Sequence, residues 1–239
     1  MNLYVRQFAE CLRAHRHRLG PMEGVEWNVA PEPVDYLDVV AGMEARVSEI
    51  RDGLAPEAIW LLEHPPLYTA GTSARPDDLL EPERFPVYAA GRGGRYTYHG
   101  PGQLVAYVMF DLERRGRDVR CHVHRLEDWV MAALLDYGVS GERRLGHPGI
   151  WVCGQGQGAV RPAAEKIAAI GVRVRRWVTY HGVAVNVCPD LEHFSGIVPC
   201  GLADAGVTSL KALGRLGGGS VDGFSEGFEA VTVTAGPTG

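Results

Sequence analysis

The sequence predicts an α+β domain in which helices cover a mixed β-sheet. Two segments with the apolar spacing of amphipathic helices alternate with short apolar segments of strand length. One of these short segments, 103–110, is apolar almost without interruption, which is typical of a strand buried on both faces in the middle of a sheet. Counting the same signals along the chain gives about six strands.

The first helix is predicted to begin at Asp35, a capping residue, and its apolar positions run from Tyr36 to Ile50. A second helix places Leu126 and Tyr137 on one face and stops at Gly138. After residue 210 the glycine-rich chain predicts only a short helix and a loose tail. Strands are predicted at 58–62, 87–90, 103–110, 149–152, 166–175 and 182–187.

Composition indicates one ordinary globular domain in a chain of 239 residues. The hydrophobic share is 46% and the charged share 22%, so the chain can bury a core. No long polar stretch divides it, and we assign 1–32 to an N-terminal extension, 33–210 to the domain and 211–239 to a glycine-rich tail. No apolar run of about 18 residues or secretory signal is present, so we expect a cytoplasmic protein with no membrane partner.

Charge and cysteine content exclude several other classes. The net charge of -5 and the pI near 6.0 argue against nucleic acid as a partner. The five cysteines form no CxxC pair, so neither a disulfide framework nor a zinc ribbon is expected. Cys121, His122 and His124 lie close together at a helix entrance, but a fourth ligand at matching spacing is missing.

The densest motif is the glycine-rich stretch 91–103. Its glycines would let backbone N–H groups approach a ligand, although a hairpin connection has the same composition. A phosphate-binding P-loop is excluded because no Gly-Lys-Ser/Thr follows and the next element is a strand. His99, within this stretch, has the chemistry of a proton shuttle or a ligand, and equally that of a hydrogen-bonded structural residue.

Two further residues carry possible chemistry. Cys200 stands between Pro199 and Gly201, an accessible setting for a nucleophile, yet an inert buried cysteine fits the same residues. Lys166 opens an apolar strand, where an ammonium group is costly unless it is paired. A lysine at a strand end with its head in solvent is the alternative.

Taken together, the stretches 63–71, 92–103, 149–152, 166–171, 181–187 and 199–201 resemble the lipoyl(octanoyl) transferase family in sequence, order and spacing. The resemblance covers roughly 35–210, and the combination of Arg-Gly-Gly…Thr-Tyr-His-Gly-Pro-Gly-Gln with the later Pro-Cys-Gly is specific. It implies the fold of biotin and lipoate ligases, which is also that of class II aminoacyl-tRNA synthetases. The segment 153–165 departs from the usual pattern of the family.

The resemblance also implies an acyltransferase and its site. Cys200 matches the nucleophile that carries the acyl group as a thioester, and Lys166 matches the lysine that lowers the thiol pKa and acts as base. The residues that match the acyl pocket are Arg92, Gly93, Gly94, Arg95, Tyr96, Thr97, Tyr98, His99, Ala169, Ile170, Gly171, Gly182, Val183 and Ala184. The backbone N–H of Gly201 is a candidate oxyanion donor.

The implied reaction is the first step of protein lipoylation. Octanoyl passes from the phosphopantetheine thiol of acyl carrier protein to a lysine of a lipoyl domain, in 2-oxoacid dehydrogenase complexes or the glycine cleavage H protein. Neither ATP nor a metal is expected, and a monomer is expected. Arg114, Arg115 and Arg117 are candidates for docking the acidic carrier, although a solvated charged loop fits them too.

Two other functions are open. An adenylating ligase on the same fold would need a lysine near the glycine-rich loop, and no lysine occurs before Glu165. A catalytically silent module that binds acylated or lipoylated domains is the second.

Overall fold

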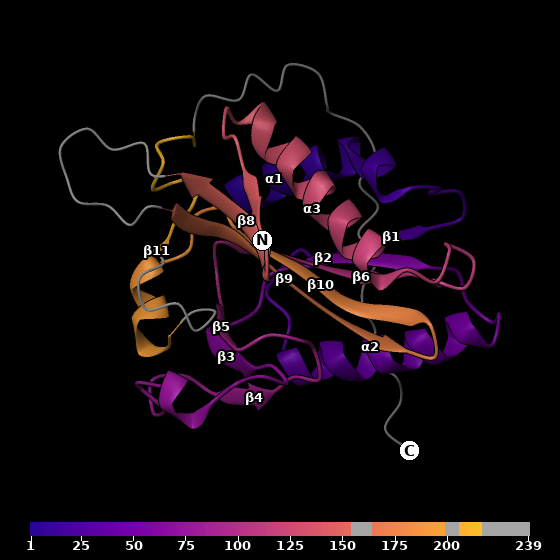
Figure 1. Ribbon diagram of the computed structural model, residues 1–239, viewed down its shortest axis with the longest axis horizontal. Helices are drawn as coiled ribbons and strands as arrows, with labels where there is room; N and C mark the ends of the chain where they lie inside the picture. Colours follow the sequence, from indigo (N-terminus) through magenta and orange to yellow (C-terminus); the bar gives the residue numbers. More distant parts are fainter. Residues whose placement is uncertain (154–163, 199–205, 217–239) are drawn as a thin grey trace.

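A mixed sheet with helices on both faces forms most of the computed structural model, which describes residues 1–153, 164–198 and 206–216 (Figure 1). Among these residues the main sheet has eight strands, in the order β1-β2-β6-β10-β9-β8-β7, with β11 paired to β9. Their bounds are β1 Glu26–Val29, β2 Ala58–Leu62, β6 Gln103–Met109, β7 Glu142–Arg144, β8 His147–Cys153, β9 Ala164–Arg175, β10 Val178–Asn186 and β11 Gly206–Val207. The predicted α+β class is confirmed.

A smaller sheet has three strands among the described residues, in the order β4-β3-β5. The strands are β3 Leu67–Ala70, β4 Val87–Ala89 and β5 Tyr96–His99. The helices are α1 Leu3–Ala14, α2 Tyr36–Arg51 and α3 Val119–Asp136, together with 3-10 turns at Arg16–Leu19, Pro76–Asp78 and Leu191–Gly196. In Figure 1, α1 and α3 lie on one side of the main sheet and α2 on the other.

The central strand β6 explains why the core has two layers. It is paired antiparallel to β2 on one side and to β10 on the other, and every residue of it is buried. Alternate side chains point to opposite faces of a strand, so Leu104 and Val108 join the core under α1 and α3, while Val105 and Met109 join the core under α2. The predicted central position of 103–110 is confirmed.

Both predicted long helices are present. The Asp35 carboxylate caps α2 by accepting a hydrogen bond of 2.8 Å from the Leu37 N–H. Helix α3 begins earlier than predicted, because Asp118 caps it by accepting from the Cys121 N–H at 2.9 Å. Gly138, just beyond the end of α3, has a φ of 68°, which a glycine adopts without strain.

The residues assigned to an N-terminal extension, 1–32, pack as part of the domain core. Phe8 and Leu12 of α1 are fully buried against α3, and the Trp129 indole donates a 2.7 Å hydrogen bond to the Leu12 carbonyl. Strand β1 adds a parallel edge to β2. Arginines interrupt the apolar stripe of α1 in the sequence, so local pattern does not predict this helix.

One other prediction needs correction. The glycine-rich stretch 91–103 is not a loop throughout, because Tyr96–His99 forms β5 and pairs with β3. The described part of the tail, 211–216, contains turns. The remainder, 217–239, lies outside the described residues, so the short helix expected after residue 210 stays a prediction.

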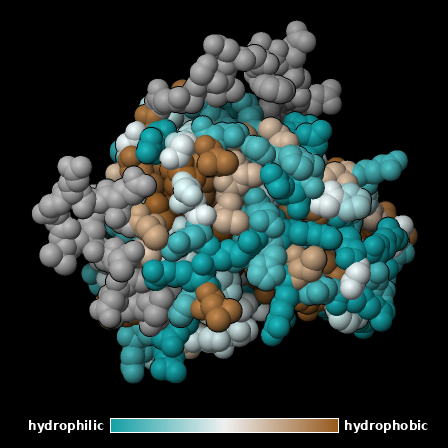
Figure 2. All heavy atoms as spheres, turned by 45° about the horizontal axis from the view of Figure 1, so that its top comes forward, coloured by the Kyte–Doolittle hydropathy of each residue, from teal (hydrophilic) through white to brown (hydrophobic). Residues whose placement is uncertain are grey.

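The molecular surface agrees with an ordinary globular domain. The face shown in Figure 2 is largely hydrophilic, and hydrophobic residues gather to the left of its centre. Within the described ranges, every helix is too short or too polar to cross a lipid bilayer.

Candidate active site

A cavity of about 560 Å³ lies where β9, β10 and the segment around β5 meet. Its wall contains 92–97 and His99 from that segment, 169–171 from β9 and 182–184 from β10. These are the pocket residues predicted from the sequence, with one exception. Tyr98 lies outside the wall: its ring is fully buried among other aromatic rings and its hydroxyl bonds to His193 Nδ1 at 2.8 Å.

Arg92 fastens the glycine-rich segment to β3. Its guanidinium donates to the carbonyls of Gly93 and Arg95 at 3.0 and 3.1 Å. It also donates to the Thr69 carbonyl at 3.1 Å and to Thr69 Oγ1 at 2.6 Å. Gly171 on β9 permits this arrangement, since a Cβ there would lie 2.8 Å from Arg92 Cδ. The planar fork of an arginine suits such multiple donation.

His99 continues this network into the sheet. Its Nδ1 lies 2.7 Å from Gln103 Oε1, and its Nε2 lies 3.4 Å from Thr69 Oγ1. The Gln103 amide donates to Asn186 Oδ1 at 3.0 Å. The Asn186 amide in turn donates to the Thr208 carbonyl at 3.0 Å. The structure therefore makes His99 a hydrogen-bonded part of the cavity wall.

Three buried histidines around the cavity are held neutral. Burial lowers the pKa of His99 well below its usual value, and nearby cationic groups add to the shift. Burial also lowers the pKa of His64 to about 4. For His181, burial with Arg92 and Arg173 lowers the pKa to about 3. At neutral pH these imidazoles are uncharged, and those of His64 and His99 make hydrogen bonds.

Lys166 is buried in the cavity wall. The alternative, a lysine at a strand end with its head in solvent, is therefore wrong. Its Nζ donates to the Pro148 carbonyl at 3.0 Å and lies 4.6 Å from the centre of the Trp151 ring. Gly149, with a φ of 125°, leaves room for it, because a Cβ at Gly149 would lie 3.3 Å from Nζ and 2.4 Å from the Ala168 carbonyl oxygen. An amine is thus presented inside a largely apolar cavity.

Cys200 and Gly201 lie outside the described residues, so the predicted nucleophile and oxyanion donor are not placed. The described chain on either side is anchored. The Val198 N–H donates at 2.8 Å to the Asp78 carbonyl, and the Asp78 side chain pairs with Arg95 at 3.1 Å. On the other side, β11 runs parallel to β9 with Val207 opposite Lys166. Both flanks therefore end beside residues of the cavity wall.

Several residues of the cavity were not predicted. Tyr36 from α2, Tyr107 from β6 and His181 from β10 all line it. Tyr107 is linked through its hydroxyl to His64 Nε2 at 2.8 Å. No spacing in the sequence separates these residues from the ordinary core. The φ of 61° at His181 is unusual for a residue other than glycine, but only the structure shows it.

The charge of the described cavity wall has one sign. Its basic side chains include Arg92, Arg95 and Lys166, and the described lining contains no carboxylate. Apolar side chains such as Ile170 and Val183 complete the wall. The arrangement suits a ligand with an apolar chain and an oxygen-bearing head that accepts hydrogen bonds.

The three arginines that the sequence offers for docking the acidic carrier differ in their exposure. Arg115 is buried and donates to both carboxylate oxygens of Glu57, at 2.8 Å to Oε1. Arg114 and Arg117 are exposed and pair with Asp111 and Glu113. A docking role is therefore open only to the latter two.

A similar fold is found in other catalytic domains. The crystal structure of lipoate-protein ligase A bound with ATP superposes with a TM-score of 0.57 at 16% identity, over 82% of this chain and 80% of that one. The class defined by the fold is thus that of a lipoate-ligase-like domain.

Sequence relatives define the family. The family described as Lipoyl protein ligase A/B catalytic domain matches residues 35–228. A curated octanoyltransferase of Cereibacter sphaeroides is 62% identical over 196 residues, 81% of this chain and 90% of its own. One of Rhodospirillum rubrum is 62% identical over 191 residues, 80% and 86% of the two chains. The chain therefore belongs to this family, and within it to the octanoyltransferases, which are acyltransferases.

Proposed function

We propose that the chain transfers octanoyl from acyl carrier protein to a lysine of a lipoyl domain, through a thioester on Cys200. The observation that carries the proposal is Lys166, whose amine is buried in the cavity wall and whose backbone pairs with β11, the strand that follows the Cys200 segment. The names of the curated relatives support octanoyl as the group transferred.

The cavity has the size and lining for a medium-length acyl chain. Its volume of about 560 Å³ lies within the range of about 300–1,000 Å³ that is common for small-molecule pockets. The walls near Ile170, Val183 and Ala184 offer apolar contacts for methylene groups. The cationic and N–H groups of 92–97 are the part of the wall that would meet the thioester and the carrier's phosphopantetheine arm.

The reaction has two half-reactions that exchange acyl groups. In the first, the Cys200 thiolate attacks the carrier thioester carbonyl, the C–S bond to phosphopantetheine breaks, and the released thiolate takes up a proton. In the second, the acceptor amine attacks the Cys200 thioester, loses a proton and forms an amide while the Cys200 sulfur leaves. The first exchange is nearly isoenergetic and the second is downhill, so ATP is not needed.

Lys166 has a role in each half-reaction. As an ammonium it would favour the Cys200 thiolate by charge pairing. As a neutral amine it would accept the proton of the attacking lysine. The hydrogen bond to the Pro148 carbonyl and the contact with Trp151 hold it in one place, which general base catalysis requires. The acceptors expected are lipoyl domains of 2-oxoacid dehydrogenase complexes and the H protein.

An ATP-dependent ligase is the competing function, because lipoate-protein ligase A has a similar fold. The decisive assay combines purified chain, octanoyl carrier protein and a lipoyl domain, with and without ATP, and a second series supplies free octanoate with ATP. The proposal expects acylation from the carrier at a rate independent of ATP, and none from free octanoate. Acylation only from octanoate with ATP would establish the ligase, and binding without acylation in either series would establish a silent module.

A further inference from the structure

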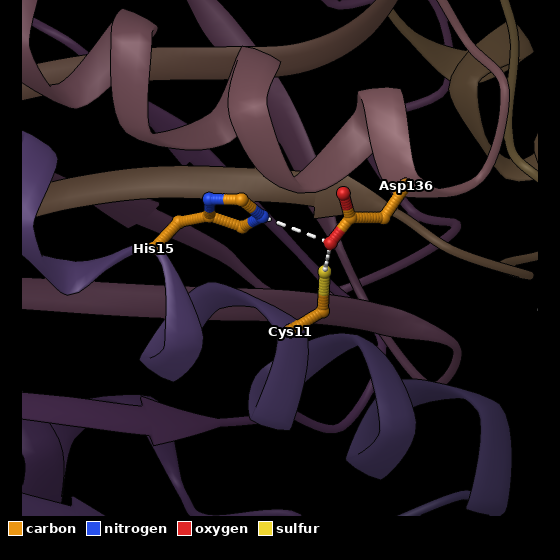
Figure 3. Close-up of side chains that lie close together, drawn as sticks. All are labelled: Cys11, His15 and Asp136. Carbon is orange, nitrogen blue, oxygen red and sulfur yellow. Dashed lines mark hydrogen bonds and ion pairs between the residues drawn. The ribbon is translucent and has the colours of Figure 1, made fainter. Parts of the chain in front are cut away.

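Three side chains of types that bind metal ions lie together at the junction of α1 and α3, far from the cavity lining. Figure 3 shows Cys11 and His15 reaching from α1 and its C-terminal cap toward Asp136, the last residue of α3. Residues four apart on a helix share one face, which is why the thiol and the imidazole meet the same carboxylate. Among the described residues, no other group of three such side chains has its ligand atoms so close together.

The distances within the cluster are short. Asp136 Oδ2 lies 2.8 Å from His15 Nε2 and 3.2 Å from Cys11 Sγ. All three ligand atoms lie within 4.8 Å of one another. Water reaches the cluster, because the Asp136 side chain is 54% exposed and that of His15 23%. Three potential ligand atoms therefore lie together at a place that solvent can reach.

The order of the three groups argues against a nucleophilic cysteine. In an activated nucleophile the imidazole stands between the thiol and the carboxylate, so that it can take the thiol proton. Here the carboxylate stands between the other two groups. Burial and the hydrogen bond to Asp136 raise the pKa of the Cys11 thiol, so in the absence of a bound cation it is a poor nucleophile.

We propose that Cys11, His15 and Asp136 form a binding site for a zinc-like divalent cation, with water as the fourth ligand. Thiolate, imidazole and carboxylate are the ligands that zinc takes in proteins, at about 2.0–2.3 Å. Such bonds place neighbouring donor atoms of a tetrahedron about 3.3–3.7 Å apart. The two distances from Asp136 Oδ2, 2.8 Å to His15 Nε2 and 3.2 Å to Cys11 Sγ, are shorter than this spacing by about half an ångström or less.

Binding of the cation releases one proton from the site. Cys11 loses its thiol proton to solvent as the sulfur bonds the cation, and Asp136 exchanges its two hydrogen bonds for a metal bond. The proton that His15 Nε2 shares with Asp136 moves through solvent to Nδ1, so that Nε2 can bind the cation in a neutral ring. The thiolate and the carboxylate then neutralise both charges of the ion. Because the imidazole binds in its neutral form, it contributes no charge.

The site would fasten α1 to the rest of the domain. Cys11 and His15 precede the range 35–228 that matches the family, whereas Asp136 lies within it. A cation bound here crosslinks α1, which precedes the matched range, to α3, which lies within it. The inference concerns stability and is independent of the proposed acyl transfer.

The test is metal binding by the full chain after removal of metals with a chelator. Zinc affinity is measured by competition with a chromogenic chelator, and cobalt is used as a probe whose thiolate bonds absorb in the near ultraviolet. We expect one zinc ion per chain, a cobalt–thiolate band, and a rise in Tm of about 5–10 °C at a hundredfold excess over Kd. Cys11→Ser and Asp136→Asn should each weaken zinc binding by more than about tenfold.

Two controls separate this site from other thiols. Cys153→Ser, which changes an exposed cysteine, should bind zinc as the unchanged chain does. If Cys200→Ser abolishes the cobalt band and Cys11→Ser retains it, the metal binds elsewhere and the proposal is wrong. The proposal is also overturned if the unchanged chain binds no zinc, or if Cys11→Ser, with its Tm in the absence of metal unchanged, shows the same zinc-dependent rise in Tm.

Discussion

The cavity and the α1–α3 junction assemble polar side chains in opposite ways. In the described cavity wall, Arg92 and Lys166 supply basic groups, His99 and His181 are buried and neutral, and carboxylates are absent. At the junction, a half-exposed carboxylate, Asp136, accepts hydrogen bonds from Cys11 and His15. The first arrangement presents donors to a ligand that accepts hydrogen bonds, whereas the second presents acceptors to a cation. Sequence motifs mark only the first.

The largest effect is expected from removing the amine of the cavity. Lys166→Met keeps most of the side chain length, and it should lower the rate of octanoyl transfer by about 10²- to 10⁴-fold, the usual contribution of a general base. Alkylation of Cys200 as a function of pH should also shift to higher pH, because the paired cation is lost. Lys211→Met, which changes the other lysine of the chain, at an exposed position, is the control. An unshifted alkylation profile in Lys166→Met would contradict the ion pair.

A smaller loss is expected from loosening the glycine-rich segment. Arg92→Lys keeps the charge but cannot reproduce the donations to Thr69 and to the carbonyls of Gly93 and Arg95. We expect kcat/KM for octanoyl carrier protein to fall about 10- to 100-fold, because a hydrogen bond to a charged group is worth about 1.5–3 kcal/mol. Arg117→Lys, at an exposed position, should change it little. Equal effects of the two substitutions would show that the charge of Arg92, and not its geometry, matters.

The neutral histidines predict how stability depends on pH. Burial lowers the pKa of His64 to about 4, whereas in the unfolded chain it should titrate near 6.5. Below pH 6.5 the unfolded chain binds the additional proton, so stability falls as the pH is lowered toward 4. Between pH 7 and pH 5 this residue alone should cost about 2 kcal/mol of unfolding free energy.

Urea unfolding at the two pH values measures this loss. His64→Gln should reduce the pH-dependent loss by that amount even if the variant is less stable overall. If His64→Gln retains the full loss between pH 7 and pH 5, His64 is not the neutral group that the structure indicates.

The smallest effect concerns charges outside both regions. Arg114 and Arg117 precede Val119, which lines the cavity at the start of α3, so they lie beside its α3 edge. Reversing both to Glu should raise KM for the acidic carrier protein by about two- to fivefold, and added salt should reduce the difference. Reversing the exposed Arg16 and Arg18 is the matched control. Identical KM values for the two double variants would remove this docking surface.

A structural feature could be predicted from the sequence when its signal lies in residues that are neighbours in the chain. The Asp35 cap and the uninterrupted apolar run of 103–110 depend on neighbouring residues, and both predictions are confirmed. Strand β5 was overlooked because its four residues stand among glycines, and its partner β3 supplies the reason it is a strand. Local pattern cannot report such pairing.

The cavity and the α1–α3 junction also differ in how local their sequence signals are. Contiguous motifs hold most of the predicted cavity residues, and the structure brings them together. Tyr107 and His181 were not predicted, since a place in the wall depends on packing between strands. The junction was not predicted at all, because Asp136 is 121 residues from His15 and neither residue belongs to a recognisable motif.

The most direct test of the account is the intact mass of the chain after incubation with octanoyl carrier protein and no acceptor. We predict an added mass equal to one octanoyl group, located on the peptide that contains Cys200, absent from Cys200→Ser, and lost when a lipoyl domain is added. An unmodified chain that still acylates the lipoyl domain, or an octanoyl group on a different residue, would contradict the proposed mechanism.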